Sequence, residues 1–209
     1  MSSATNRRDR ARLPGPERRR QILDVTTRLI AERGFWGLSM QDVADGCGLT
    51  VPGLLHHVGS KDGLLVAVLE HRDAEDGRSL AAQLGLRPPE PADWTALART
   101  PGVDLRRVCA ALVRRNATQP EIVRLFAVLE AESLAPDHPA HDYFADRQAK
   151  TLDVFTELAR PLCDDPRTLA RQAVAMMDGL QIQWLRAPAE TDLVDAWDAA
   201  AATLFGRPR

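Results

Sequence analysis

The side chains with the clearest chemical potential in this sequence are two adjacent imidazoles, His56 and His57, followed by the serine–lysine pair Ser60-Lys61. Further serine and threonine hydroxyls precede them along the chain. Imidazoles can ligate a metal ion, whereas hydroxyl, imidazole and ammonium groups together can hydrogen-bond the phosphates and base edges of DNA. Metal binding and nucleic-acid binding are therefore the two chemistries to compare.

The two histidines are poorly arranged for zinc, because adjacent residues on a helix point about 100° apart and no third ligand lies near them. A second group has histidines and carboxylates at the short spacing of a zinc or manganese site: Asp137, His138, His141 and Asp142. That stretch also fits a helix start, with Asp137 as the cap and Pro139 in the first turn. We predict neither a metal nor any other cofactor.

Familiar catalytic motifs are absent from the sequence. It holds no GxSxG, no phosphate-binding loop, no HExxH and no paired Cys/His set, so we predict that the protein is not an enzyme. The three cysteines are far apart and form no CxxC pair, which disfavours a disulfide framework: Cys47, Cys109 and Cys163. They are expected to be buried thiols, with a redox-sensing cysteine as the alternative.

The net charge of −2 is unevenly distributed. Residues 1–61 carry ten Lys and Arg against six Asp and Glu, so this end is basic and the remainder is acidic. A basic end on an acidic body predicts a polyanion as the partner of that end alone. Residues 1–15, rich in Arg, Ser, Pro and Gly, are predicted to form a disordered basic arm.

Neither a membrane span nor an export signal is evident. No apolar run approaches the roughly 18 to 20 residues that cross a bilayer, and the basic N-terminus lacks the apolar segment of a secretory signal. With 44% hydrophobic and 27% charged residues, the composition is typical of a globular protein. We predict a cytoplasmic protein with no membrane partner.

Helical patterns surround the candidate DNA-contacting groups. Apolar residues at helical spacing predict a helix from Glu17 that ends at Gly34. Ser39 predicts the start of the next helix, because Ser39 and Asp42 form a Ser-x-x-Asp pattern similar to a capping box.

Two more helix starts follow closely. Thr50 is expected to cap a short helix that has Pro52 in its first turn and Gly59 at its end, and Ser60 is expected to cap the next. A helix, a glycine corner and a short second helix form a helix-turn-helix. The short helix over 51–57 would present its N-terminal turn to the major groove, while the N-termini of the flanking helices grip the DNA backbone.

The rest of the chain also predicts helices and essentially no strands. A proline-rich connection over 85–102 precedes helices at about 103–117, 120–134, 142–159, 166–186 and 191–205. Their expected start signals are Thr100-Pro101, Gln119-Pro120, Asp165-Pro166 and Thr191. The predicted fold class is all-α, with about nine helices.

Residues 17–70 resemble the DNA-binding domain of TetR-family transcriptional regulators. The resemblance is carried by a Gly-Phe element after the first helix, a Ser-x-x-Asp-Val-Ala helix, a Gly-Leu-Thr turn and the Ser-Lys-Asp-x-Leu-Leu opening of the fourth helix. It implies a DNA-binding domain over 16–76 and a ligand-binding and dimerisation domain over 77–209. Segments of the C-terminal part also resemble one actinobacterial-type branch of the family.

The recognition helix departs from the family pattern at Leu55, where a tyrosine hydroxyl commonly reaches a phosphate. Its first turn also lacks Arg, Lys, Asn and Gln, so bidentate contacts to guanine or adenine are not available there. We expect base reading to rely on Thr50, on Val51 and Pro52 against thymine methyl groups, and on His56. The predicted DNA-binding residues are Ser39, Met40, Thr50, Val51, Pro52, Gly53, Leu55, His56, His57 and Lys61. For the histidines, the alternative is one exposed and one packed side chain without DNA contact.

The resemblance also implies a homodimer in which the last two helices pair across a two-fold axis. Apolar residues at helical spacing predict the interface: Leu169, Ala173, Met176, Leu180, Leu193, Trp197 and Leu204. For each of them, burial within a single chain is the alternative. A dimer also suits the geometry of DNA, because one short helix reads few bases.

A pocket for a small-molecule effector is expected between the middle helices. Aromatic, methionine and a few polar side chains are typical of such pockets, and the candidates are Trp94, Phe126, Glu130, Met177, Gln181 and Trp184. The same residues would also suit a core. Glu130 fits either a cationic ligand or a salt bridge to a nearby arginine.

These observations predict a TetR-like regulator, acting as a repressor, that binds a palindromic double-stranded operator as a dimer and is released by a small molecule. The sign of regulation rests on the resemblance. The alternative is an all-helical protein-interaction module whose helix-turn-helix does not bind DNA specifically.

Overall fold

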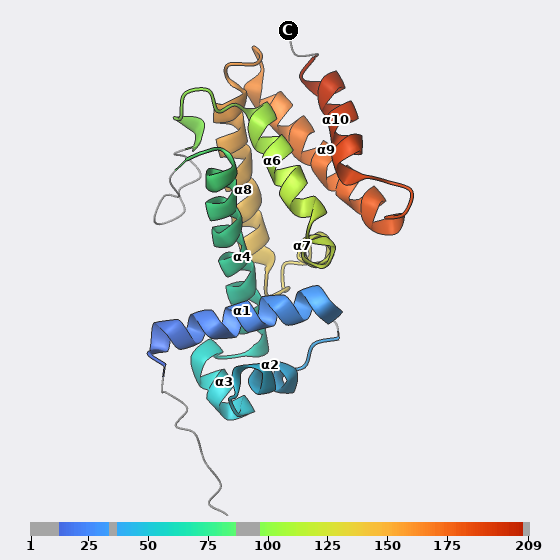
Figure 1. The fold of residues 1–209 in the computed structure, drawn as a ribbon. Coiled ribbons are helices and arrows are strands. Elements are labelled where there is room, and N and C mark those ends of the chain that lie inside the picture. The colour runs from blue at the N-terminus through green and yellow to red at the C-terminus, as the bar shows by residue number, and fades with distance from the viewer. Residues whose placement is uncertain (1–12, 34–36, 87–96, 207–209) are drawn as a thin grey trace, which may run out of the picture.

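A computed structural model of the protein describes residues 13–33, 37–86 and 97–206. The described residues form helices and no strands, which confirms the all-α prediction (Figure 1). Trp94 and most of the predicted basic arm lie outside these ranges. The helices are α1 (Gly15–Arg33), α2 (Met40–Cys47), α3 (Val51–Val58), α4 (Lys61–Gln83), α6 (Leu105–Ala117), α7 (Pro120–Glu132), α8 (His141–Ala159), α9 (Pro166–Arg186) and α10 (Leu193–Leu204).

The helix starts around the recognition helix follow from N-cap chemistry. The Ser39 hydroxyl accepts a hydrogen bond from the Asp42 amide at 3.1 Å, and the Asp42 carboxylate accepts one from the Ser39 amide at 2.9 Å. This reciprocal pair is the predicted capping box. Hydrogen bonds from Ser39 hold the pKa of Asp42 below its ordinary value, which favours the charged form of the cap.

Thr50 and Ser60 cap the next two helices as predicted. The Thr50 hydroxyl accepts from the Gly53 amide at 3.2 Å, and the Ser60 hydroxyl accepts from the Gly63 amide at 2.9 Å. Gly48 ends α2 with a φ of 65°, in the left-handed region that favours glycine. The corner between α2 and α3 is therefore fixed by its local sequence.

The long helix α4 leaves the DNA-binding lobe and continues upward into the C-terminal body, while α1 lies across the junction (Figure 1). The predicted domain boundary between residues 76 and 77 thus falls inside a continuous helix. No flexible linker separates the two lobes at this point, because α4 remains helical from Lys61 to Gln83.

Three predicted helix starts in the C-terminal body are wrong. A turn at residues 100–102 replaces the start predicted at Thr100-Pro101, and Asp104 caps α6 through the Arg107 amide at 2.9 Å. Helix α8 begins at His141, so Asp137 does not cap it. Asp192, rather than Thr191, caps α10. The start at Asp165-Pro166 is confirmed, because Asp165 accepts from the Thr168 amide at 3.2 Å.

The buried apolar side chains form two clusters. One contains the inner faces of α1 to α4 and extends into the body through Ile122, Leu125 and Leu129 of α7 and Phe144 of α8. The other fills the body between α6, α8, α9 and α10. The DNA-binding lobe is therefore joined to the body by a shared apolar core. In the residues that the structure describes, no helix is long and apolar enough to cross a membrane.

Candidate nucleic-acid interface

The recognition helix α3 is positioned by its buried face. Leu54 is fully buried and Val58 nearly so, both in the cluster that includes the inner face of α1. Leu49 packs against the same cluster, as expected for the helix-turn-helix. The outer face of α3 is consequently turned to solvent.

That outer face carries the predicted base-reading groups. Thr50, Pro52, Leu55 and His56 are exposed, whereas Val51, Gly53 and His57 are half-buried. Exposure of Thr50 and Pro52 at the start of α3 leaves these two side chains free to approach a groove, as the helix-turn-helix docking geometry requires. The thymine-methyl contact predicted for Pro52 is sterically open, and that for Val51 is more restricted.

The N-termini of α2 and α4 lie side by side next to α3. Ser39, Met40 and Lys61 line one small hollow of about 20 Å³ together with buried apolar residues. The two helix N-termini and the exposed Lys61 therefore lie on the same side of the lobe. This arrangement suits two contacts to one phosphate backbone.

The two histidines have different surroundings. Their rings contact edge to face with centroids 5.5 Å apart, while Arg19 of α1 donates a hydrogen bond to the His57 carbonyl at 3.0 Å. Arg19 was not among the predicted site residues, although it belongs to the arginine run at the start of α1. It stabilises the C-terminal end of α3, where carbonyl groups lack partners within the helix.

Gly63 allows α4 to begin close behind α3. A Cβ atom at this position would lie 2.6 Å from the Val58 carbonyl oxygen. We therefore expect Gly63→Ala to lower the free energy of unfolding by about 1–3 kcal/mol and to weaken DNA binding by displacing α3. Urea unfolding and fluorescence anisotropy would measure the two effects. Gly15→Ala is the control, since a Cβ atom there meets nothing within 4 Å; equal stability of the two variants would contradict the close approach.

The predicted effector-pocket residues serve packing and internal hydrogen bonding. Met177 and Trp184 are buried in the core of the body. Gln181 accepts a hydrogen bond from Asn116 at 2.9 Å, and Phe126 packs edge to face on Phe144 with centroids 6.0 Å apart. Glu130 is half-buried and lies close enough to Asp178 and Arg147 to affect them electrostatically.

None of these five residues lines the three clefts described for the protein. The clefts lie at the junction of α1, α4 and α7, beside the exposed arginines of α8 and α9, and at the small hollow near α2. The prediction placed the pocket among side chains that instead fill space between helices, because periodicity does not separate a cavity wall from a core.

The predicted interface residues divide into two groups. Leu169, Ala173, Leu193 and Trp197 are buried in the core of a single chain, so the structure corrects their assignment to an exposed dimer surface. Leu180 and Leu204 are half-buried, and Met176 is 39% exposed. Four of the seven therefore hold α9 and α10 onto their own protomer.

The histidines of the metal-like stretch make local hydrogen bonds. His141 contacts the Ser133 carbonyl through Nδ1 at 2.7 Å, and His138 Nδ1 lies 3.2 Å from the Ala140 amide that donates to it. These bonds close the turn between α7 and α8. Both imidazoles therefore have a structural role in this turn.

Polar contacts tie α4 to the body. Asp73 accepts hydrogen bonds from the Tyr143 hydroxyl at 2.6 Å and from Arg147 at 3.1 Å. The guanidinium of Arg147 also lies over the Phe126 ring, 5.1 Å from its centroid. Burial raises the pKa of Tyr143, and the Asp73 carboxylate beside it raises that pKa further. The hydroxyl is therefore a fixed donor.

The geometry defines a class of protein. Helices α1 and α2 hold the recognition helix α3 beside the N-termini of α2 and α4. A larger helical body is joined to them through α4. This is a helix-turn-helix DNA-binding protein with a C-terminal helical domain.

Comparison with known proteins gives the family. Residues 22–68 match the family described as bacterial regulatory proteins, tetR family. The chain is 28% identical over 178 residues to the HTH-type transcriptional regulator BetI of Burkholderia cenocepacia. The aligned region covers 81% of each of the two chains. The match to the tetR family model thus covers the helix-turn-helix region, and the longer similarity is to a transcriptional regulator.

Two solved structures share the fold. AibR in complex with isovaleryl coenzyme A and operator DNA has a TM-score of 0.61 and 23% identity, covering 91% of this chain and 100% of that one. Thermus thermophilus FadR, a TetR-family transcriptional repressor in complex with lauroyl-CoA, has a TM-score of 0.56 and 17% identity, covering 91% and 95%. At these identities the likeness concerns the fold.

Proposed function

We propose that the protein is a dimeric repressor that binds a palindromic operator through α3 and releases it when a small molecule binds the body. The DNA-binding part of the proposal is supported by the exposure of Thr50 and Pro52 at the start of α3, next to the adjacent N-termini of α2 and α4. The predicted contact residues on this surface are the proposed DNA contacts, and Arg19 of α1 holds the end of α3 through its hydrogen bond to the His57 carbonyl.

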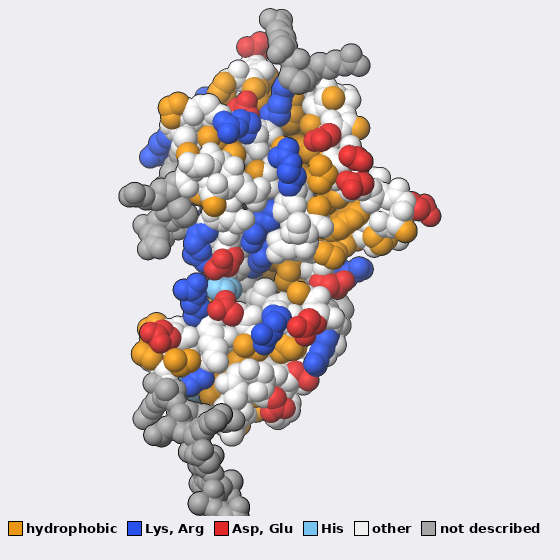
Figure 2. Space-filling view, in the orientation of Figure 1, with side chains coloured by type: hydrophobic (Ala, Val, Ile, Leu, Met, Phe, Trp, Pro, Cys, Tyr) orange, Lys and Arg blue, Asp and Glu red, His pale blue; other side chains and the backbone are white. Residues whose placement is uncertain are grey.

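A homodimer is supported by an exposed face of α9. Met176 and Ile182 are 39% and 42% exposed, and Ala175 and Gly179 lie between them on the same side of the helix. Small residues at the centre of such a face permit close approach of a second helix. Hydrophobic side chains gather on the side of the body where α9 and α10 lie (Figure 2). Ile182 and Met176 therefore replace the four buried residues in the proposed interface.

Replacing Ile182 with glutamate is expected to convert the dimer to a monomer, since the charge would be buried against an apolar partner surface. Sedimentation velocity would show the change in mass. Operator affinity should fall together with the dimer, because two recognition helices bind one palindrome. Lys150→Glu, an exposed charge reversal on α8, is the control. An unchanged dimer in the Ile182 variant would rule out this face of α9.

Ligand control is supported by proteins of the same fold that were solved as complexes with acyl-coenzyme A molecules, among them AibR and Thermus thermophilus FadR. The description of FadR as a repressor supports the proposed sign of regulation. Because its partner would be genomic DNA, we place the protein in the bacterial cytoplasm.

The test of the proposed function is fluorescence anisotropy with DNA from upstream of the protein's own gene, titrated at several salt concentrations beside a scrambled duplex. Tight, salt-dependent and sequence-selective binding is expected. If the protein binds both duplexes weakly and equally, a selection of bound fragments from the whole genome would test whether the operator lies elsewhere. Failure of that selection as well would favour the alternative, a helical protein-interaction module.

A further inference from the structure

A cleft of about 380 Å³ lies where the DNA-binding lobe meets the body. Its walls are formed by α1, by α4, and by the turn between α6 and α7 with the first turn of α7. Figure 2 shows this waist of the molecule as a hollow with basic and acidic side chains around it. The volume is within the range of roughly 300–1,000 Å³ that is typical of small-molecule sites.

Two side chains in the wall have buried polar atoms without hydrogen-bond partners. They are the Thr27 hydroxyl of α1 and the Nε group of Arg72 in α4. Arg72 is only 6% exposed. Its Nη2 forms an ion pair with the Asp76 carboxylate at 2.8 Å, whereas its Nε has no acceptor. Most buried polar groups in proteins have partners, so two such atoms on one cleft indicate a missing acceptor.

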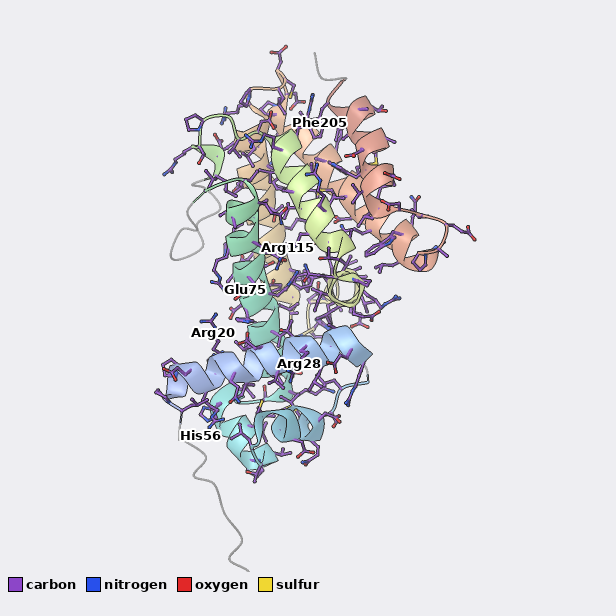
Figure 3. The ribbon with its side chains drawn as sticks, viewed as in Figure 1. Arg20, Arg28, His56, Glu75, Arg115 and Phe205 are labelled. Atoms are coloured by element: carbon purple, nitrogen blue, oxygen red, sulfur yellow. The ribbon has the colours of Figure 1, made fainter. Side chains whose placement is uncertain are left out.

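The local charge favours an anion as that acceptor. Each acidic side chain of the wall already has a basic partner: Asp24 contacts His71, Glu75 contacts Arg78 and Glu121 contacts Arg124. Behind the wall, the single carboxylate of Asp76 is shared by the guanidiniums of Arg72 and Arg115. At the rim, Arg28 has no ion-pair partner within the described ranges. Figure 3 shows Arg28, Glu75 and Arg115 around this junction.

We propose that the cleft binds a small molecule through a compact oxyanion, either a carboxylate or a phosphate. Nε and Nη2 of Arg72 form one edge of the guanidinium, which can donate two parallel hydrogen bonds to such a group. The Thr27 hydroxyl donates a third, and Arg28 contacts the ligand from the rim. This site is separate from the predicted effector pocket, and its ligand contacts α1, α4 and α7 at once, so it stabilises one arrangement of the two lobes.

The test is a titration of the full-length protein, followed through the arginine Nε–H signals in NMR spectra, with inorganic phosphate, acetate and chloride at matched ionic strength. A saturable shift of the Arg72 signal is expected with phosphate or acetate and not with chloride. Saturation by phosphate alone identifies a phosphate-bearing ligand, and saturation by acetate alone identifies a carboxylate-bearing one.

Three variants make the test specific. Thr27→Val keeps the side-chain shape and removes only the hydroxyl, and it should weaken anion binding by about tenfold. Arg28→Gln should weaken it as well, whereas Lys150→Gln on the exposed face of α8 should not. The absence of a saturable shift, or equal anion affinity of the Thr27→Val and unmodified proteins, would overturn the proposal. The measurement needs no DNA, so its outcome is independent of the proposed regulatory function.

Discussion

Replacing Trp197 with alanine is expected to lower the free energy of unfolding by about 3–5 kcal/mol, the largest effect on stability of any single change considered for this protein. Trp197 is 1% exposed and is among the largest fully buried side chains. It lies on α10, which packs against both α6 and α9. Alanine would leave a cavity among three helices, and these helices cannot readily shift to fill it.

The same residue supports the C-terminal end of the chain. The Trp197 ring contacts Phe205 edge to face, with centroids 6.4 Å apart. Arg106 of α6 covers the Phe205 ring and donates a hydrogen bond to its carbonyl at 2.7 Å. Loss of the indole should therefore loosen the end of α10 as well as its middle.

Urea unfolding followed by circular dichroism would measure the effect at a fixed protein concentration, because dimerisation adds to the apparent stability. Thr203→Ala, at an exposed position of the same helix, should change stability by less than about 0.5 kcal/mol. If Trp197→Ala cost no more than this control, α10 would not be held by the core described here.

The second large effect is expected at Lys61, where a change to glutamate should reduce operator affinity by about a hundredfold. Lys61 is exposed at the first residue of α4, beside the N-terminus of α2. A hydrogen bond to a charged group contributes about 1.5–3 kcal/mol, and the proposed dimer would lose one contact in each half-site. The reversed charge would in addition repel the phosphates.

Anisotropy at several salt concentrations would separate this role from base reading. Lys61→Ala should weaken binding to all duplexes alike and lower the slope of log affinity against log salt by about one for each protomer. Lys150→Glu on α8 makes the same charge reversal as Lys61→Glu but lies away from α3, so it should leave the operator affinity nearly unchanged. A change in sequence preference with an unaltered salt slope would instead assign Lys61 to base contact.

Elements fixed by short-range chemistry were predictable from the sequence. The caps at Ser39, Thr50 and Ser60 depend on hydrogen bonds across three residues, and all three are present. Where two cap-capable signals compete within a few residues, the sequence is ambiguous. Helix α6 is capped by Asp104 and does not start at Thr100-Pro101, because Gly102 between them has a left-handed φ of 76° that a helix does not continue through.

Features that depend on distant contacts were not predictable. Helical periodicity identifies the apolar side of α9 and α10 but not whether the chain's own core or a second protomer covers it, so Trp197 and Leu169 were assigned to the wrong surface. The shared carboxylate of Asp76 joins α4 to Arg115, 39 residues away. The junction cleft, where Nε of Arg72 lacks an acceptor, is likewise formed by three helices that are separated in the sequence, so no local pattern predicts it.

The uninterrupted course of α4 has a mechanical consequence. With 23 residues the helix is about 35 Å long, so it acts as a lever whose lower end begins at the recognition helix. A tilt of about 10° would displace that end by about 6 Å, which exceeds the base-pair step of about 3.4 Å. A rotation that barely changes packing in the body is thus enough to take a pair of recognition helices out of register with two half-sites.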